Sequence, residues 1–158
     1  MKVYTIGVYN STEQEFFNKL TENRIDTFCD IRQRRGVRGR EYSFVNSNYL
    51  QAKLDDLGIK YRHIFDLAPT SEIREKQKAE DIKQGVQKRT RDTLGPIFIE
   101  EYKKKISTFN FDDFYDQLDY IGTLKVVFFC VEEKPEACHR SIVAQEMNKR
   151  FKCEIIHL

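Results

Sequence analysis

The sequence predicts a single α/β domain in which a mainly parallel sheet of about five strands has helices on both faces. Three observations support this fold class. Short β-rich segments alternate with helical patterns along most of the chain, which is typical of parallel strands joined by helical crossovers. The segment LKVVFFCV, residues 124–131, is almost continuously apolar, as expected of a strand buried on both faces. The length of 158 residues suits one domain, and together these features favour a Rossmann-like arrangement.

The first half of the chain follows this alternation closely. The β-rich segment KVYTIGVY is followed by Ser11 and Thr12, either of which can cap a helix with phenylalanines and a leucine on one face. A later helical pattern stops at Gly58, a residue that commonly ends helices. The elements expected here are strands at 2–8, 25–31 and 59–65 and helices at 13–24 and 48–58.

The second half contains one interruption. Residues 70–108 are highly charged with scattered apolar side chains, so we expect a helical insertion, broken near Gly95 and Pro96, within the single domain 1–158. The alternation then resumes to the end of the chain. The elements expected there are helices at 110–121 and 136–151 and strands at 125–131 and 153–157.

Composition excludes several classes of protein. Hydrophobic residues make up 40% and charged residues 33% of the chain, which fits a globular rather than a disordered protein. No apolar run approaches the ~18 residues that a membrane span needs. The start, MKVYTIGVY, lacks the features of a signal peptide, so we expect a cytoplasmic protein whose four cysteines are reduced. The net charge of +2 does not by itself indicate a nucleic-acid binder.

Most of the candidate reactive side chains lie in CVEEKPEACHR, residues 130–140, between the apolar strand and the next helix. Ligands of open α/β sheets bind beyond the carboxyl ends of the strands, where this segment is expected. A helix start favours anions and lowers the pKa of a nearby thiol, which makes Cys138 a candidate nucleophile. Glu132 is a candidate general acid or base, and Arg140 can pair with a phosphate. His139 and Asp30 are the expected orienting or catalytic groups, while Cys130 and Asn10 are expected to line the site.

Packing offers an alternative interpretation of the same residues. Free cysteines are often simply small buried residues, and His139 and Arg140 can have purely structural partners. The spacing of the motif does not match a tyrosine-phosphatase loop. A structural zinc site usually shows closely spaced cysteine pairs. Because Cys130 and Cys138 are eight residues apart and His139 directly follows Cys138, we expect neither a metal nor another cofactor.

A second candidate element, DIRQRRGVRGREY, is rich in arginine. Its glycines allow the backbone to approach a ligand, and the neighbouring Tyr42, Phe44 and Tyr49 offer stacking faces, a combination suited to phosphates and bases. A solvated basic loop is the alternative. Lys88, Arg89 and Arg91 can extend the same basic surface. The arginines expected to contact phosphate are Arg32, Arg34, Arg35, Arg38 and Arg40.

Several segments together resemble the bacterial and archaeal family catalogued as domain of unknown function 488. The segments are YTIGVYN, CDIRQRRGVRGREYSF, LDDLGIKYRHIFDLA and CVEEKPEACHRSIVAQEM with the terminal EIIHL, in the family's order. The chain departs from the family pattern at Val8-Tyr9, where His-Ser is usual, and at its arginine-rich loop. The resemblance implies an α/β fold and a pocket that joins the conserved motifs. The residues that it places in this pocket are Asp30, Arg32, Cys130, Glu132, Cys138, His139 and Arg140.

These observations support one leading hypothesis and two alternatives. The leading hypothesis is a protein that binds a phosphate-bearing ligand, either a nucleotide or a nucleic acid, and hydrolyses it. The first alternative is a non-catalytic nucleic-acid-binding module in which the cysteines only pack. The second is a thiol-based redox sensor that uses Cys130 and Cys138. No membrane partner is expected.

Overall fold

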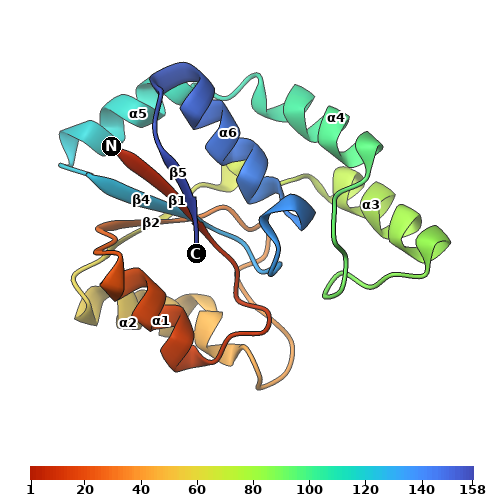
Figure 1. Ribbon diagram of the computed structural model, residues 1–158, viewed down its shortest axis with the longest axis horizontal. Helices are drawn as coiled ribbons and strands as arrows, with labels where there is room; N and C mark the ends of the chain where they lie inside the picture. Colours follow the sequence, from red (N-terminus) through yellow and green to blue (C-terminus); the bar gives the residue numbers. More distant parts are fainter.

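The computed structural model describes all 158 residues and contains one sheet of five strands, all parallel, in the order β3-β2-β4-β1-β5 (Figure 1). The predicted α/β class and each of the five predicted strands are confirmed. The observed strands are shorter than predicted: β1, β3 and β4 end earlier, where the chain forms the loops of the carboxyl edge, whereas β5 begins two residues later. Their bounds are Lys2–Ile6 (β1), Thr27–Asp30 (β2), Lys60–His63 (β3), Lys125–Phe129 (β4) and Ile155–His157 (β5).

Strand β4 lies at the centre of the sheet, between β1 and β2. Its last four residues are buried, which explains its nearly continuous apolar sequence. Alternate side chains enter different cores. Phe128 packs with residues of one apolar cluster and Phe129 with residues of the other, so that the strand contributes to both layers.

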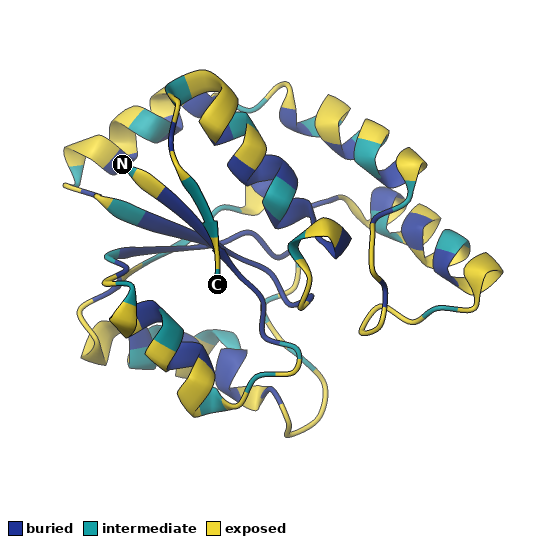
Figure 2. Ribbon diagram, viewed as in Figure 1, coloured by how far each residue is buried: buried dark blue, intermediate teal, exposed yellow.

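Helices cover both faces, as predicted (Figures 1 and 2). Helices α1 and α2 pack on one face through side chains such as Phe16 and Leu50. Helices α5 and α6 cover the other face, and α3 and α4 extend that layer beyond the sheet. No helix is long and apolar enough to cross a lipid bilayer. The helices are Glu13–Glu22 (α1), Ser47–Asp56 (α2), Ser71–Gln84 (α3), Pro96–Ile106 (α4), Phe111–Tyr120 (α5) and His139–Phe151 (α6).

Local sequence signals set the helix ends. Thr12 and Glu15 form a reciprocal capping box at the start of α1, and Pro96 occupies the first turn of α4. Gly58, the predicted stop of α2, has a φ of 69°, a conformation that glycine adopts readily. The last long helix starts at His139, three residues later than predicted, because Pro135–Ala137 forms a separate 3-10 turn.

The charged segment 70–108 folds as two helices joined by residues 85–95, and most of its charges face solvent. Three of its polar side chains are buried together. Asp81 accepts hydrogen bonds from Gln77 and from Arg91, each 2.7 Å long. The connection is also tied to the body of the domain, since the Leu94 amide donates to the Glu136 carbonyl over 3.1 Å. This link brings the charged segment to the carboxyl edge of the sheet.

Gly7 follows β1 and lies very close to the backbone of the loop after β4, residues 130–138, called the β4 loop below. A Cβ atom at this position would lie 1.9 Å from the Glu132 carbonyl oxygen, a backbone atom that cannot move away freely. We therefore expect Gly7→Ala to lower the free energy of unfolding by about 3 kcal/mol or more, measured by urea denaturation. Gly36→Ala is the matched control, because its Cβ would meet only the Asn46 side chain at 3.7 Å. Equal stability of the two variants would contradict this packing.

Candidate functional site

The candidate site lies at the carboxyl edge of the sheet, where the loops after β1, β2 and β4 meet. Asp30 pairs with Phe129 in the β2–β4 register, so Asp30 and Cys130 lie at the same edge, as expected from the sequence. The β4 loop also pairs with the β1 loop, because the amides of Val8 and Tyr9 both donate to the Val131 carbonyl over 3.1 Å. Segments far apart in the sequence therefore form one continuous surface.

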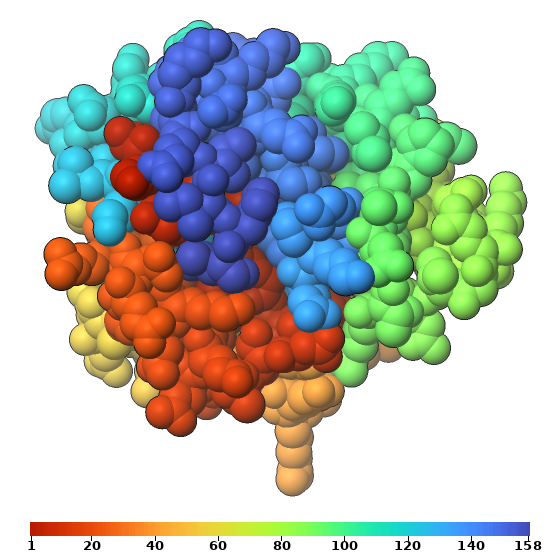
Figure 3. Space-filling model, viewed as in Figure 1, coloured from red at the N-terminus to blue at the C-terminus, as the bar shows by residue number.

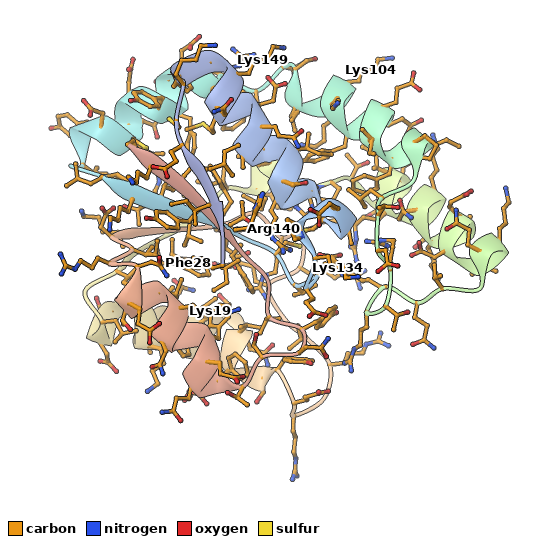
Figure 4. The ribbon with its side chains drawn as sticks, in the orientation of Figure 1. Lys19, Phe28, Lys104, Lys134, Arg140 and Lys149 are labelled. Atoms are coloured by element: carbon orange, nitrogen blue, oxygen red, sulfur yellow. The ribbon has the colours of Figure 1, made fainter.

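Arg140 fixes the β4 loop through hydrogen bonds to two of its backbone carbonyls. Its side chain is fully buried and lies next to the loop after β4 (Figure 4). One guanidinium nitrogen donates to the Glu132 carbonyl over 2.5 Å and the other to the Glu133 carbonyl over 2.7 Å. These contacts join the first turn of α6 to the loop that follows β4. Both terminal nitrogens of Arg140, which the sequence analysis expected to bind an anion, are therefore used within the protein. Arg140 also does not line the pocket described below.

Asp30 and Arg32 form a buried ion pair. The Arg32 guanidinium donates two hydrogen bonds to the Asp30 carboxylate, of 2.8 and 2.6 Å, and Tyr61 donates a third of 3.0 Å. Burial and the charge of Asp30 raise the pKa of Tyr61 to about 12, so this phenol remains a donor. Asp30 is fully buried and serves to orient Arg32. The Nη1 atom of Arg32 has no partner although it is buried, and Arg32 lines the pocket.

Cys130, Cys138 and His139 meet in one cluster. Their sulfur and ring nitrogen atoms all lie within 4.8 Å of one another, and the Cys138 Sγ is 3.7 Å from His139 Nδ1. The other ring nitrogen, Nε2, lies 3.0 Å from the Ile31 carbonyl oxygen. A carbonyl only accepts, so Nε2 carries the hydrogen of this bond. The lone pair of a neutral His139 is then on Nδ1 and faces the sulfur atoms.

The two thiols of the cluster have opposite acidities. Burial raises the pKa of Cys138, but a hydrogen bond with Cys130 and the charges of His139 and Arg140 outweigh it and hold that pKa well below its usual value. The hydrogen bond with Cys138, together with burial, raises the pKa of Cys130 well above its usual value. Burial lowers the pKa of His139, but the charge of Cys138 outweighs it and raises that pKa. Cys138 is therefore the thiolate of the pair and Cys130 the thiol.

Glu132 is held beside this cluster by two basic residues of the charged segment. Its Oε1 atom lies 3.4 Å from the Lys88 ammonium and 3.4 Å from the Arg91 guanidinium. Its Oε2 atom is buried and has no partner. Burial lowers the pKa of Lys88, but nearby negative charges, that of Glu132 foremost, outweigh it and raise that pKa. The charge of Lys88 thus persists at neutral pH.

A pocket of about 700 Å³ opens above these groups. Cys130, Glu132, Cys138 and His139 form part of its lining. One wall comes from the predicted arginine-rich loop and the other from the charged segment, whose residues 85–95 lie against the β4 loop in Figure 3. Eight lining side chains are basic and only three are acidic. The basic residues are Arg32, Arg34, Arg38, Arg74, Lys78, Lys88, Arg89 and Arg91.

The expected aromatic surface is only partly present. Tyr42 lines the pocket, whereas Phe44 packs in the core and the Tyr49 hydroxyl donates to Glu13 on the outside. Tyr9, which the sequence analysis did not assign to the site, lies beside Tyr42 with 5.3 Å between ring centroids. The Arg89 guanidinium lies over both rings, 5.3 and 5.4 Å from their centroids. These three side chains form a stacking surface at the pocket.

Five expected site residues lie outside the pocket lining: the buried Asp30 and Arg140, and also Arg35, Arg40 and Asn10. The Asn10 side chain donates to Glu133 over 2.5 Å, while its amide donates to the Tyr42 hydroxyl over 3.0 Å. Asn10 thus holds the β1 loop against its neighbours. Lys88, Arg89 and Arg91 line the pocket, as the sequence analysis allowed for a wider basic surface, whereas Arg74 and Lys78 were not predicted because their charges were expected to lie on solvated helix faces. The apolar residues scattered among these charges were the available signal, because Ile82, Val86, Leu94 and Phe98 all line the pocket.

The buried pair of Asp30 and Arg32 can be tested through stability. Asp30→Ala leaves the Arg32 charge buried without its carboxylate, which typically costs about 3–5 kcal/mol. Denaturant unfolding should show a loss of this size. The matched control is Glu154→Ala, which removes an exposed pair with Lys2 and should change the unfolding free energy little. Comparable losses in both variants would argue against a special role for the buried pair.

The acidity of Cys138 can be tested by alkylation. Iodoacetamide attacks thiolates, so the rate for Cys138 should rise with a midpoint below the ~8.5 of a free cysteine. Cys29 is the internal control, since burial raises its pKa to about 12, and burial also raises the pKa of Cys153. Mass-spectrometric mapping from pH 5 to 9 gives the rates. If Cys138 reacts no faster than Cys153, the thiolate assignment is wrong.

Comparisons with known proteins agree with the motifs described above. The family model described as Domain of unknown function DUF488 matches residues 12–147, which include the arginine-rich loop, the β4 loop and most of α6. No curated protein and no solved structure matches the chain. The matched range covers far more than half of the sequence and contains nearly all of the pocket's walls. The chain therefore belongs to the DUF488 family.

Proposed function

We propose that this protein binds a phosphate-bearing ligand, a nucleotide or a nucleic acid, in the pocket at the carboxyl edge of its sheet, and hydrolyses it there. The observation that carries the proposal is the unpartnered, buried Nη1 of Arg32 inside a pocket with eight basic side chains. A buried donor without a partner is costly, and a phosphate oxygen would satisfy it. Because Asp30 fixes the guanidinium, the donor is already oriented for such a contact.

The excess of positive charge fits an anion rather than a neutral ligand. Glu132 is paired with Lys88 and Arg91, and Asp81 with Arg91, so these carboxylates repel an incoming phosphate less than free carboxylates would. Arg34 and Arg38 are exposed and have no acidic partner within ion-pair distance. The two exposed cations Arg34 and Arg38 at the rim and the fixed Arg32 inside suit a ligand with more than one phosphate.

The tyrosine and arginine surface favours a nucleobase as the other part of the ligand. Tyr9 and Tyr42 contact each other in a tilted arrangement at the pocket, and the Arg89 guanidinium lies over both rings. Aromatic rings and guanidinium planes stack on any base, with about 1–3 kcal/mol per base. A nucleotide would therefore place its base on this surface and its phosphates toward Arg32 and the basic rim.

Hydrolysis is assigned to the floor of the pocket, where Cys138, His139 and Glu132 gather. The four cysteines are free, which fits the proposed cytoplasmic location with its reducing conditions. A non-catalytic binding module would use the same walls and differ only in leaving the ligand intact. Product analysis after incubation with nucleoside triphosphates and oligonucleotides separates the two.

Binding can be measured by fluorescence anisotropy with a labelled nucleotide, a labelled single strand and a labelled duplex. The double variant Arg34→Ala/Arg38→Ala should bind at least about tenfold more weakly, because two phosphate contacts are lost. For duplex DNA, the slope of log affinity against log salt should become shallower by about 0.9 per lost contact. Lys104→Ala/Lys149→Ala removes the same charge from exposed positions outside the pocket and is the matched control.

Two results would overturn the proposal. One is the absence of binding to all three probes at low salt. The other is equal loss of affinity in the pocket variant and in the control, since binding would then depend on net charge alone.

A further inference from the structure

We propose that Cys130, Cys138 and His139 form a binding site for a zinc ion on the floor of the pocket. Cysteine sulfur and imidazole nitrogen are the ligand types that zinc prefers, and binding the ion would release the proton of the Cys130 thiol. All three side chains are at least nine-tenths buried, and all three line the pocket. The site is independent of the basic walls and of the nucleotide proposed above.

The distances fit one tetrahedral ion. Zinc bonds to sulfur are about 2.3 Å long and bonds to nitrogen about 2.0–2.1 Å, so that a sulfur and a nitrogen on one ion lie roughly 3.6 Å apart. The Cys138 Sγ and His139 Nδ1 are 3.7 Å apart. Every pair among the three ligand atoms is within 4.8 Å, so small rotations of the cysteine side chains bring all three into range.

His139 is already oriented as a ligand. Its Nε2–H donates to the Ile31 carbonyl, which leaves Nδ1 as the nitrogen that can bind an ion. Metal-binding histidines usually have such a bond from the second ring nitrogen, because it fixes both the ring and the tautomer. Tyr102 packs edge-on against the imidazole with 5.2 Å between ring centroids and restricts it further.

The backbone explains how two adjacent residues can share one ion. The sequence analysis expected no metal partly because His139 directly follows Cys138, which makes joint ligation of one ion awkward. Cys138, however, has an extended conformation with φ −139° and ψ 144°, and α6 begins at the next residue. This change of backbone conformation between the two residues turns both side chains toward Cys130. The β4 loop, held by Arg140, supplies the third ligand from eight residues earlier.

The surroundings leave a fourth position for a ligand other than protein. Three protein ligands are typical of zinc sites that keep one position open. Zinc with two thiolates is neutral, so the nearby Lys88 and Arg91 do not oppose it as they would oppose a free cation. Glu132 lines the same pocket, and its unpartnered Oε2 is available for a water on the ion. Only the identity of this fourth ligand, water or a phosphate oxygen, rests on the proposed function.

Cobalt(II) is the direct probe, because thiolate ligands give it an intense charge-transfer absorption. The reduced, metal-stripped full chain should bind about one cobalt or zinc ion per molecule, measured by absorption and by mass spectrometry of metal content. Cys130→Ser and Cys138→Ser should each lose most of the charge-transfer band. Cys29→Ser and Cys153→Ser are the matched controls and should keep it. Circular dichroism of each variant tests whether it folds.

His139→Gln gives a second test with both thiols intact. Loss of an outer-shell partner already weakens metal binding about 10- to 100-fold, so loss of a ligand should weaken it at least as much. Zinc should also protect Cys138 from iodoacetamide in the wild-type chain. This readout does not depend on any variant.

The proposal is overturned if the reduced wild-type chain gives no thiolate-to-cobalt band. It is equally overturned if the Cys29 and Cys153 controls lose the band as strongly as the cluster variants. Formation of a Cys130–Cys138 disulfide in place of metal binding would support the redox interpretation instead. Metal binding without nucleotide binding would leave this site standing and reject the proposed ligand, and the reverse result would do the opposite.

Discussion

The contact on which the site depends is the buried Arg140 guanidinium against the carbonyls of Glu132 and Glu133. It fixes the loop after β4 to the first turn of α6. This contact helps to keep Cys130 and Cys138 close together, because the loop between them contains only a short 3-10 turn of regular structure. Gly7 completes the arrangement, since only a residue without a side chain lets the β1 loop lie against Glu132.

Buried charges at this edge are arranged in pairs that leave a positive surplus. Asp30 is used entirely by Arg32 and Tyr61, and Glu132 is held by Lys88 and Arg91. Each carboxylate therefore orients a basic group. The remaining donors face the pocket, where positive charge in a partly desolvated site acts more strongly than at the open surface.

The two proposals describe different parts of one pocket. The walls, with Arg32, Arg34 and the neighbouring rings of Tyr9 and Tyr42, would select an anionic ligand with a base. The floor, with two cysteines and a histidine, would hold an ion and place it beside the phosphates. A zinc-bound water is a better hydrolytic group than a buried thiol, because the ion lowers the pKa of the water toward neutrality. If zinc is present, Cys138 acts through the metal and not as a nucleophile.

The sequence by itself determined the fold class and which motifs lie at the carboxyl edge of the sheet. The alternation of strand and helix patterns, the apolar β4 and the glycine and proline signals predicted five strands in one sheet, because these features act through local backbone preferences and burial. It also placed Asp30 and Cys130 at the same edge, since parallel strands end together. The resemblance to the family pointed to the same motifs.

Only the tertiary structure decided what these residues touch. The sequence predicted that Arg140 binds an anion, yet the fold buries its guanidinium against the carbonyls of Glu132 and Glu133. Lys88 and Arg91 were expected at most to extend a basic surface, yet ion pairs with Glu132 and a backbone hydrogen bond from Leu94 hold their segment against the site. Cys138 and His139 are adjacent, which the sequence analysis took as unfavourable for binding one metal ion, yet the change of backbone conformation at the start of α6 brings both side chains close to Cys130. Such contacts join residues distant in sequence or depend on the backbone conformation at one residue, and neither composition nor periodicity carries that information.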